Sequence, residues 1–172
     1  MKFDFDTPAP PSSQVRELHP GMTWEQMAQA PTFRTAARTI TEADLMTFVQ
    51  WGGFNEPLFW DASHAGEGGY TGRLCPGALV YCFAEGLVLQ SLALHGTGLA
   101  FLSMELKVLG PTYVGDTLHA VVETTSARPT SKPGRGIVAS RVTVRNQRGE
   151  DVQVFTPVRM IRGKDYATIS EV

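Results

Sequence analysis

Disulfide scaffolds and zinc sites need more cysteine than this chain contains. Its 172 residues include two cysteines, Cys75 and Cys82. They lie seven positions apart in a segment whose apolar pattern predicts one helix, and no histidine lies at metal-ligand spacing from them. We therefore expect no disulfide framework, no metal site and no other cofactor.

The chain also lacks a strong excess of either charge. Lys and Arg total 15 against 17 Asp and Glu, which gives a formal net charge of -2, and the basic residues are scattered. A nucleic-acid partner is not predicted, because such a partner calls for a basic patch.

Long apolar runs are missing as well. The longest, residues 78–94, is interrupted by Glu85 and Gln90 and falls short of the roughly 20 apolar residues that a membrane-spanning helix needs. The N-terminus reads Met-Lys-Phe-Asp-Phe-Asp, without the basic-then-apolar order of a signal peptide. We expect a cytoplasmic protein that does not contact a membrane.

The chain does have the length and the 42% hydrophobic content for one well-packed domain. We place this domain at residues 21–165, between an extended Pro- and Ser-rich lead-in (residues 1–20) and a short tail (residues 166–172). Thr41 is the expected N-cap of a first helix, which the pair Gly52-Gly53 ends, and residues 51–61 should form a loop.

A second helix is expected over residues 78–92, ended by His95-Gly96. It is apolar almost all round, as a helix covered by a sheet should be. Strand patterns follow at residues 99–108, 117–125, 136–145 and 151–160, and a turn at residues 146–149 joins the last two. With a loosely alternating segment at residues 32–39, this order predicts an α+β fold in which a curved antiparallel sheet wraps around a long central helix.

Two neighbouring motifs carry a family resemblance. Residues 53–61 read Gly-Phe-Asn-Glu-Pro-Leu-Phe-Trp-Asp, and residues 72–77 read Gly-Arg-Leu-Cys-Pro-Gly. They resemble the MaoC-like (R)-specific enoyl-CoA hydratase/dehydratase family, with its motif Gly-Asp-x-Asn-Pro-(Leu/Ile/Val)-His-x-Asp and its Arg-x-x-His-Gly segment before the central helix. The residues in register are Pro57, Leu58, Asp61, Arg73 and Gly77.

The resemblance covers about residues 39–162 and includes the turn Gly110–Leu118, to which we give a structural role only. It implies a single hot-dog domain and an acyl thioester ligand, of coenzyme A or of an acyl carrier protein.

The family's acid–base pair is replaced in this chain. An ungapped match puts the family Asp at Phe54 and the family His at Phe59. If Glu56 is an insertion, the Asp position becomes Gly53 and the His position is still Phe59. Neither phenylalanine nor glycine transfers a proton near neutral pH, so hydration cannot use these positions.

Gly77 is the main binding candidate. The resemblance implies that its N–H, at the start of the central helix, hydrogen-bonds the thioester carbonyl, where the helix dipole adds partial positive charge. The alternative is a glycine needed for close packing. The remaining substrate-binding candidates are Phe54, Asn55, Phe59, Trp60 and Cys75. We expect the aromatic residues among them to line one apolar tunnel together with Trp51.

Cys75 has two interpretations. A helix N-terminus can depress a thiol pKa, which would make the cysteine a nucleophile, but a free cysteine is more often a small buried apolar residue.

Glu85 is the first of three catalytic candidates. A carboxylate in an apolar helix is costly to bury, and burial would raise its pKa into the range of a useful base. The alternative is an exposed or ion-paired Glu at the edge of the helix. Glu56 in the motif and His64 after it complete the set, and His64 could equally be a surface or capping residue.

The sequence therefore indicates a dehydratase or enoyl-hydratase family protein that acts on or binds an acyl thioester through a non-standard or relocated site. The alternatives are a thioesterase-like hydrolase and a non-catalytic partner subunit. We expect little ordinary hydratase activity, with any residual turnover dependent on Glu85. A homodimer joined sheet edge to sheet edge is expected, or a heteromer with an active hot-dog chain.

Overall fold

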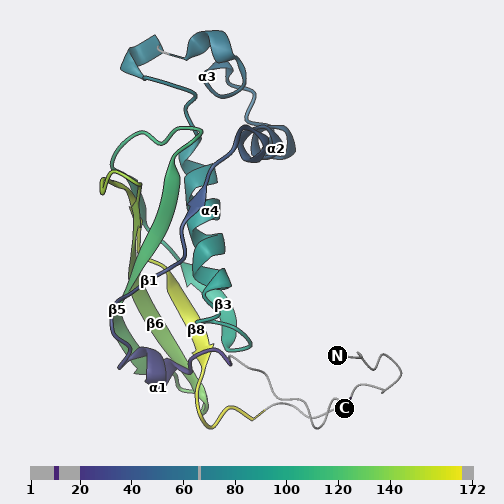
Figure 1. Cartoon of the computed structure of the whole chain (residues 1–172). Helices are drawn as coiled ribbons and strands as arrows, with labels where there is room; N and C mark the ends of the chain where they lie inside the picture. The colour runs from purple at the N-terminus through teal and green to yellow at the C-terminus, as the bar shows by residue number, and fades with distance from the viewer. Residues whose placement is uncertain (1–9, 12–19, 66, 168–172) are drawn as a thin grey trace, which may run out of the picture.

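The computed structural model describes residues 10–11, 20–65 and 67–167 (Figure 1). Most of the expected lead-in and residues 168–172 of the tail lie outside these ranges. The helical elements are α1 (Trp24–Met27), α2 (Glu42–Gly52), α3 (Pro57–Trp60), η2 (Ala62–His64), η3 (Glu67–Gly69) and α4 (Gly77–Gln90). The strands are β1 (Phe33–Arg34), β2 (Arg38–Thr39), β3 (Gly98–Ser103), β4 (Leu106–Val108), β5 (Thr117–Pro129), β6 (Arg135–Arg145), β7 (Asp151–Phe155) and β8 (Val158–Arg162).

The strands form one antiparallel sheet in the order β1-β5-β6-β7-β4, with β2 also on β5 and with β8 between β6 and β3. One half of β6 pairs with β7 and the other half pairs with β8. The outer edge is therefore shared by β4 and β3. Figure 1 shows α4 lying against one face of this sheet, as the sequence predicts.

Two of the expected strands are each broken into two. Residues 99–108 form β3 and β4, and residues 151–160 form β7 and the start of β8. Pro157 lies at the second break, where it has no N–H to give to a ladder. The two breaks lie side by side, because the Thr156 amide donates to the Glu105 carbonyl at 2.9 Å.

Helix α4 begins at Gly77 as expected but ends at Gln90, short of the expected His95-Gly96. Leu92 has a positive φ of 62°, a left-handed conformation that helical residues do not adopt. The face of α4 that packs on the sheet and on α2 consists of Leu79, Val80, Phe83, Ala84, Leu87 and Val88.

Helix α2 starts and stops where the sequence predicts. Thr41 and Asp44 form a reciprocal capping box, and Gly53 ends the helix in the left-handed conformation at φ 68°. The loop expected over residues 51–61 is wrong at six residues, because Trp51 and Gly52 end α2 and Pro57 opens the four-residue helix α3. Proline at the first helical position fits, since its missing N–H would have no partner there.

Candidate functional site

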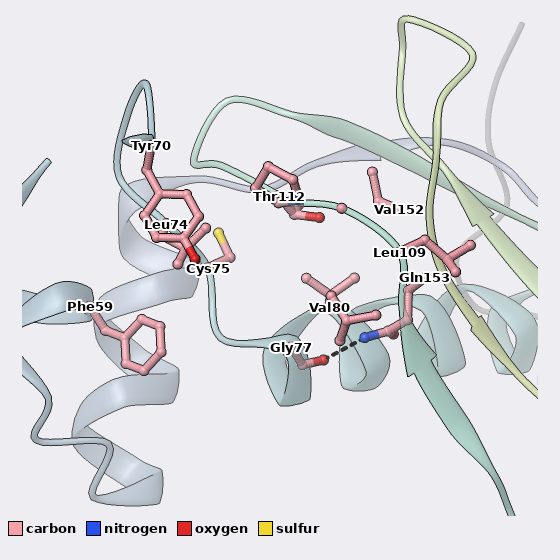
Figure 2. A pocket seen from close by; sticks show the side chains of 13 residues that line it. Phe59, Tyr70, Leu74, Cys75, Gly77, Val80, Leu109, Thr112, Val152 and Gln153 are labelled. Carbon is pink, nitrogen blue, oxygen red and sulfur yellow. Dashed lines mark hydrogen bonds between the residues drawn. The ribbon is translucent and has the colours of Figure 1, made fainter. Parts of the chain in front are cut away.

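A cavity of about 360 Å³ lies at the start of α4 (Figure 2). Its walls come from the segment before α4, α3, the loop after β4, and β7. The apolar side chains on the walls are Phe59, Leu74, Val80, Val108, Leu109, Pro111 and Val152, and the polar ones are Tyr70, Cys75, Thr112 and Gln153. The wall residues, all in the described part of the chain, include no carboxylate, imidazole or ammonium group.

Gly77 forms the floor of this cavity at the first turn of α4. First-turn N–H groups have no acceptor within their own helix, and the helix dipole makes this end partly positive. A Cβ added to Gly77 would lie 3.1 Å from Cγ2 of Val108, so the absent side chain also keeps the cavity open. The polarising role and the packing role expected from the sequence are compatible in this geometry.

Gln153 is a wall residue that the sequence analysis missed. Its side chain is 1% exposed, and its Nε2 donates to the Gly77 carbonyl at 2.9 Å, the dashed contact in Figure 2. Gln153 alternates with the buried Phe155 on the inward face of β7, where the two residues pair with Val144 and Val142 of β6. Val152 is buried as well, because a shift in the β6–β7 register lies beside it. The sequence analysis missed Gln153 because a polar residue within a strand pattern does not by itself indicate an inward position.

The structure brings together Phe54 and Phe59, the two residues that the ungapped match expects at the family's Asp and His positions. The rings of Phe54 and Phe59 lie 6.5 Å apart, edge to face, and Phe48 lies 5.0 Å from Phe54 on the other side. Phe59 lines the cavity, whereas Phe54 packs behind it against the core. An aromatic cluster thus occupies the two positions that the ungapped match expects for the acid–base pair.

The expected single aromatic tunnel is wrong. Trp51 is 86% exposed and borders a separate hollow with Leu79. Trp60 is 49% exposed and lies with Asn55 in a further hollow beside α2. Successive residues of a helix such as α3 point in different directions, so Phe59 and Trp60 cannot line the same wall.

Arg73 links the segment of α3 to α2 through two contacts of its guanidinium group. Its Nη2 donates to the Phe59 carbonyl at 3.1 Å and lies 2.8 Å from Oε1 of Glu42. These contacts hold α3 beside the cavity.

The three catalytic candidates lie away from the cavity wall. Nη2 of Arg159 contacts both carboxylate oxygens of Glu85 at 2.6 and 2.7 Å, which confirms the ion-paired alternative. Glu85 is eight residues beyond Gly77, roughly 12 Å along the helix. Glu56 is an exposed N-cap of α3, and Nδ1 of His64 lies 3.2 Å from Asp61 at the surface of the motif. The structure does not bring the three candidates together.

Cys75 lines the cavity, but a nucleophilic role is not favoured. Burial, together with the negative charge of Asp116, raises the pKa of its thiol to about 12. Of the two interpretations, the raised pKa favours the small buried apolar residue, since burial disfavours the thiolate.

The described residues contain neither a cluster of metal-binding side chains nor a membrane-spanning helix. Across residues 20–65 and 67–167, His, Cys, Asp and Glu side chains do not gather in threes that could hold a metal ion. Among the helices of the same residues, none combines the length and the apolar character needed to cross a bilayer.

Relatives of known structure share this architecture. A MaoC-like dehydratase from Rhodospirillum rubrum superposes with a TM-score of 0.75 at 27% identity, covering 85% of this chain and all of that one (100%). A Mycobacterium tuberculosis protein with a double hot-dog fold superposes with a TM-score of 0.75 at 23% identity, over 86% of this chain and 46% of that one. The predicted hot-dog fold is confirmed.

A curated relative matches part of the sequence. The mitochondrial 3-hydroxyacyl-(acyl-carrier-protein) dehydratase FERN of Solanum lycopersicum is 33% identical over 92 residues, 54% of this chain and 53% of that protein. The chain thus spans about half the length of this relative. Because that protein is mitochondrial, the cytoplasmic location stays an expectation.

The model of the FAS1-like dehydratase domain region matches residues 29–155. This match spans the motif, the cavity and most of the sheet. The resemblance to MaoC-like dehydratases is confirmed, and the chain belongs to the FAS1-like dehydratase domain family, with a hot-dog fold.

Proposed function

We propose that this chain binds an acyl thioester, of coenzyme A or of an acyl carrier protein, in the cavity at the start of α4. The Gly77 N–H donates to the thioester carbonyl, and the apolar walls hold the acyl group. The observation that carries this proposal is the position of the first-turn amide at the floor of a cavity of about 360 Å³ with mainly apolar side chains. Cavities of roughly 300–1,000 Å³ with few polar groups are typical of small-molecule sites.

The same cavity argues against efficient hydration or dehydration by one chain alone. Both reactions need a base and an acid within hydrogen-bond reach of the reacting carbons. Phe54 and Phe59, which the ungapped match aligns with the family Asp and His, pack against each other, and Glu85 is ion-paired with Arg159. A thioesterase-like hydrolase that uses Glu85 meets the same objection. We infer that a second chain supplies the acid–base pair.

The open sheet edge offers a place for that second chain. Within the described residues, strand β3 pairs only with β8 and strand β4 only with β7. The exposed apolar side chains along this edge and just beyond it are Phe101, Leu102, Leu106, Val108 and Leu109. Val108 and Leu109 also line the cavity, so a chain docked here lies next to the bound thioester. The chain by itself forms a homodimer through this edge, and a related hot-dog chain with Asp and His replaces one copy in an active heteromer.

Calorimetric titration of the purified chain with a saturated acyl-CoA tests the binding function, and Gly77→Ala is the informative variant. The added methyl group meets Val108 at 3.1 Å and narrows the floor of the cavity, so we expect at least about ten-fold weaker binding, roughly 1.4 kcal/mol. Gly86→Ala is the matched control on the same helix, because a Cβ there meets nothing within 4 Å. Equal affinity of the two variants would refute the site, and rapid hydration of an enoyl-CoA by the chain alone would refute the missing acid–base pair.

A further inference from the structure

Two arginines lie directly opposite each other in the β6–β8 ladder. Arg135 begins β6, Arg162 ends β8, and the two are Cα partners. Directly opposite residues of an antiparallel pair project to the same face of the sheet. Arg159 of β8 projects toward α4, where it pairs with Glu85, so alternation along β8 puts Arg162 on the outer face. The outer face of the sheet therefore carries two adjacent positive charges.

The ring of Tyr166 contacts both guanidinium groups. Its centroid lies 5.5 Å from Cζ of Arg135 and 4.8 Å from Cζ of Arg162. The backbone fixes the place of this tyrosine, because its amide donates to the Gly163 carbonyl at 3.2 Å and the Gly163 amide donates to the Gly134 carbonyl at 2.7 Å. Gly134 has a φ of 70°, and a Cβ there would lie 2.6 Å from Cα of Tyr166, so only glycine permits this approach. The fold thus positions the two arginines and their aromatic neighbour together.

These two charges have no counter-ion within residues 20–65 and 67–167. None of the ion pairs in this part of the chain includes Arg135 or Arg162, and Asp165, next to Tyr166, pairs with neither of them. Like charges directly opposite each other destabilise a sheet, and a tyrosine ring attracts cations without neutralising them. Of the side-chain nitrogens of the two arginines, only Nε of Arg162 is buried without a partner, so the terminal Nη groups are open to solvent. An anion that joins the two guanidinium groups explains this arrangement better than packing does.

We propose that Arg135 and Arg162 bind a phosphate monoester group on the outer face of the sheet, at a site beyond the proposed thioester cavity. Each guanidinium group presents parallel N–H donors that match two phosphate oxygens. A phosphate monoester carries roughly 1.5 to 2 negative charges at pH 7, close to the two positive charges, whereas a carboxylate carries one. The exposed Lys132, in the turn before β6, adds to the local positive potential, and Lys164 adds less because it lies beside Glu25.

This phosphate site is separate from the cavity. Ile161, the residue before Arg162, packs with Leu94 beyond the last turn of α4, whereas the cavity lies at Gly77 in the first turn. The 14 residues of α4 span roughly 21 Å. Figure 1 shows the end of β8 beside α1, at the end of the molecule away from α3. A phosphate bound at the two arginines therefore belongs to a second ligand, either a free phosphorylated metabolite or a phospholipid headgroup.

Glycerol 3-phosphate and vesicles that contain phosphatidic acid are the two probes, because both carry a phosphate monoester on glycerol. Glycerol 3-phosphate is titrated at constant ionic strength and followed by NMR through the arginine Nε–Hε signals, and vesicle binding is measured by co-sedimentation. We expect the signals of Arg135 and Arg162 to shift together, and Arg135→Gln and Arg162→Gln each to weaken binding about ten-fold or more. Arg141→Gln is the matched control, since Arg141 lies on the same face of β6, opposite Glu123, and its loss changes the net charge equally.

The outcomes separate a built site from general charge attraction. Binding of glycerol 3-phosphate supports the site with a free metabolite as its ligand, and binding of the vesicles alone supports it with a lipid headgroup. Failure of the wild type to bind either probe overturns the proposal, and so does an equal loss of binding in Arg141→Gln. Arg135→Lys keeps the charge and the contact with Tyr166 but not the parallel donors, so it should bind several-fold more weakly even if a Gln variant proves unstable to denaturant. Unchanged binding in Arg135→Lys would also overturn the proposed site.

Discussion

Helix α4 carries two polar sites that differ in how completely they are satisfied. In the middle of the helix, Glu85 is ion-paired with Arg159 of β8, whose Nη2 contacts both carboxylate oxygens. At the start of the helix, Gly77 and Gln153 line a cavity, and Oε1 of Gln153 has no partner in the described residues. The carboxylate is the more conspicuous residue in the sequence, yet the residues on the cavity wall are the uncharged Gly77 and Gln153.

The difference shows why charge alone is a weak guide to a site. A buried carboxylate needs a partner to be tolerated, and once paired it is held away from other chemistry. An open polar group next to a cavity is tolerated at a cost to stability and stays free to bind. Substitutions in the Glu85–Arg159 pair should therefore affect the free energy of unfolding most, whereas substitutions at Gly77 should affect ligand binding most.

The largest loss of stability should follow Arg159→Leu. The change leaves the Glu85 carboxylate without its partner in a region where the two side chains are only 9% and 16% exposed. We expect the free energy of unfolding to fall by about 2–4 kcal/mol, measured by denaturant titration, with unchanged acyl-CoA affinity. The double variant Glu85→Leu with Arg159→Leu should recover most of the loss. A loss of acyl-CoA affinity at full stability would show that the pair belongs to the binding site after all.

The sequence predicts a structural feature well where neighbouring residues determine it, and poorly where a distant part of the chain determines it. The Thr41 cap, the Gly53 stop and the start of α4 at Gly77 follow from neighbouring residues, and all are confirmed. The end of α4 and the two strand breaks depend on a left-handed leucine and on a proline facing a distant strand, which periodicity does not show.

The site divides in the same way. Gly77, Phe59 and Cys75 are on the cavity wall, as the motif resemblance implies, although their roles stay predictions. Trp60 and Asn55 turn to another face because of α3. Gln153 was missed because a glutamine is usually exposed on a strand, whereas here it shares the inward face of β7 with Phe155.

Asp116 is a second buried carboxylate whose hydrogen bonds are satisfied, and its substitution should cause the next largest loss of stability. Burial would raise the pKa of this carboxyl, but hydrogen bonds from the Tyr113 amide, Gln147 and Arg148 outweigh burial and lower the pKa below its usual 3.8. A carboxyl with a lowered folded-state pKa stabilises the fold above its unfolded-state pKa, and this contribution is lost as pH falls through the folded-state value. Stability should therefore decline below about pH 3.8.

Asp116→Asn should flatten that decline and cost about 1–2 kcal/mol at neutral pH, because an amide cannot accept all three bonds. Asp151→Asn is the control, since Asp151 forms an exposed pair with Arg145 whose removal should cost about 1 kcal/mol or less. Denaturant titrations at several pH values measure both variants. An unchanged acid profile in Asp116→Asn would mean that other carboxyl groups govern the decline.

The smallest expected effect is a difference in alkylation rate between the two cysteines. Cys75 lies on the buried part of the cavity wall, and Cys82 lies on the surface of α4. Cys75 is buried with a thiol pKa of about 12, whereas Cys82 is exposed, although burial of part of its thiol and the charge of Glu85 raise its pKa as well. Because the thiolate is the reactive form, iodoacetamide near pH 8.5 should label Cys82 slowly and Cys75 only after unfolding. Peptide mass spectrometry of the folded and denatured chain separates the two sites. Labelling of Cys75 in the folded chain at the rate of Cys82 would mean that the helix N-terminus does activate this thiol, and the cavity would then hold a nucleophile beside the thioester carbonyl.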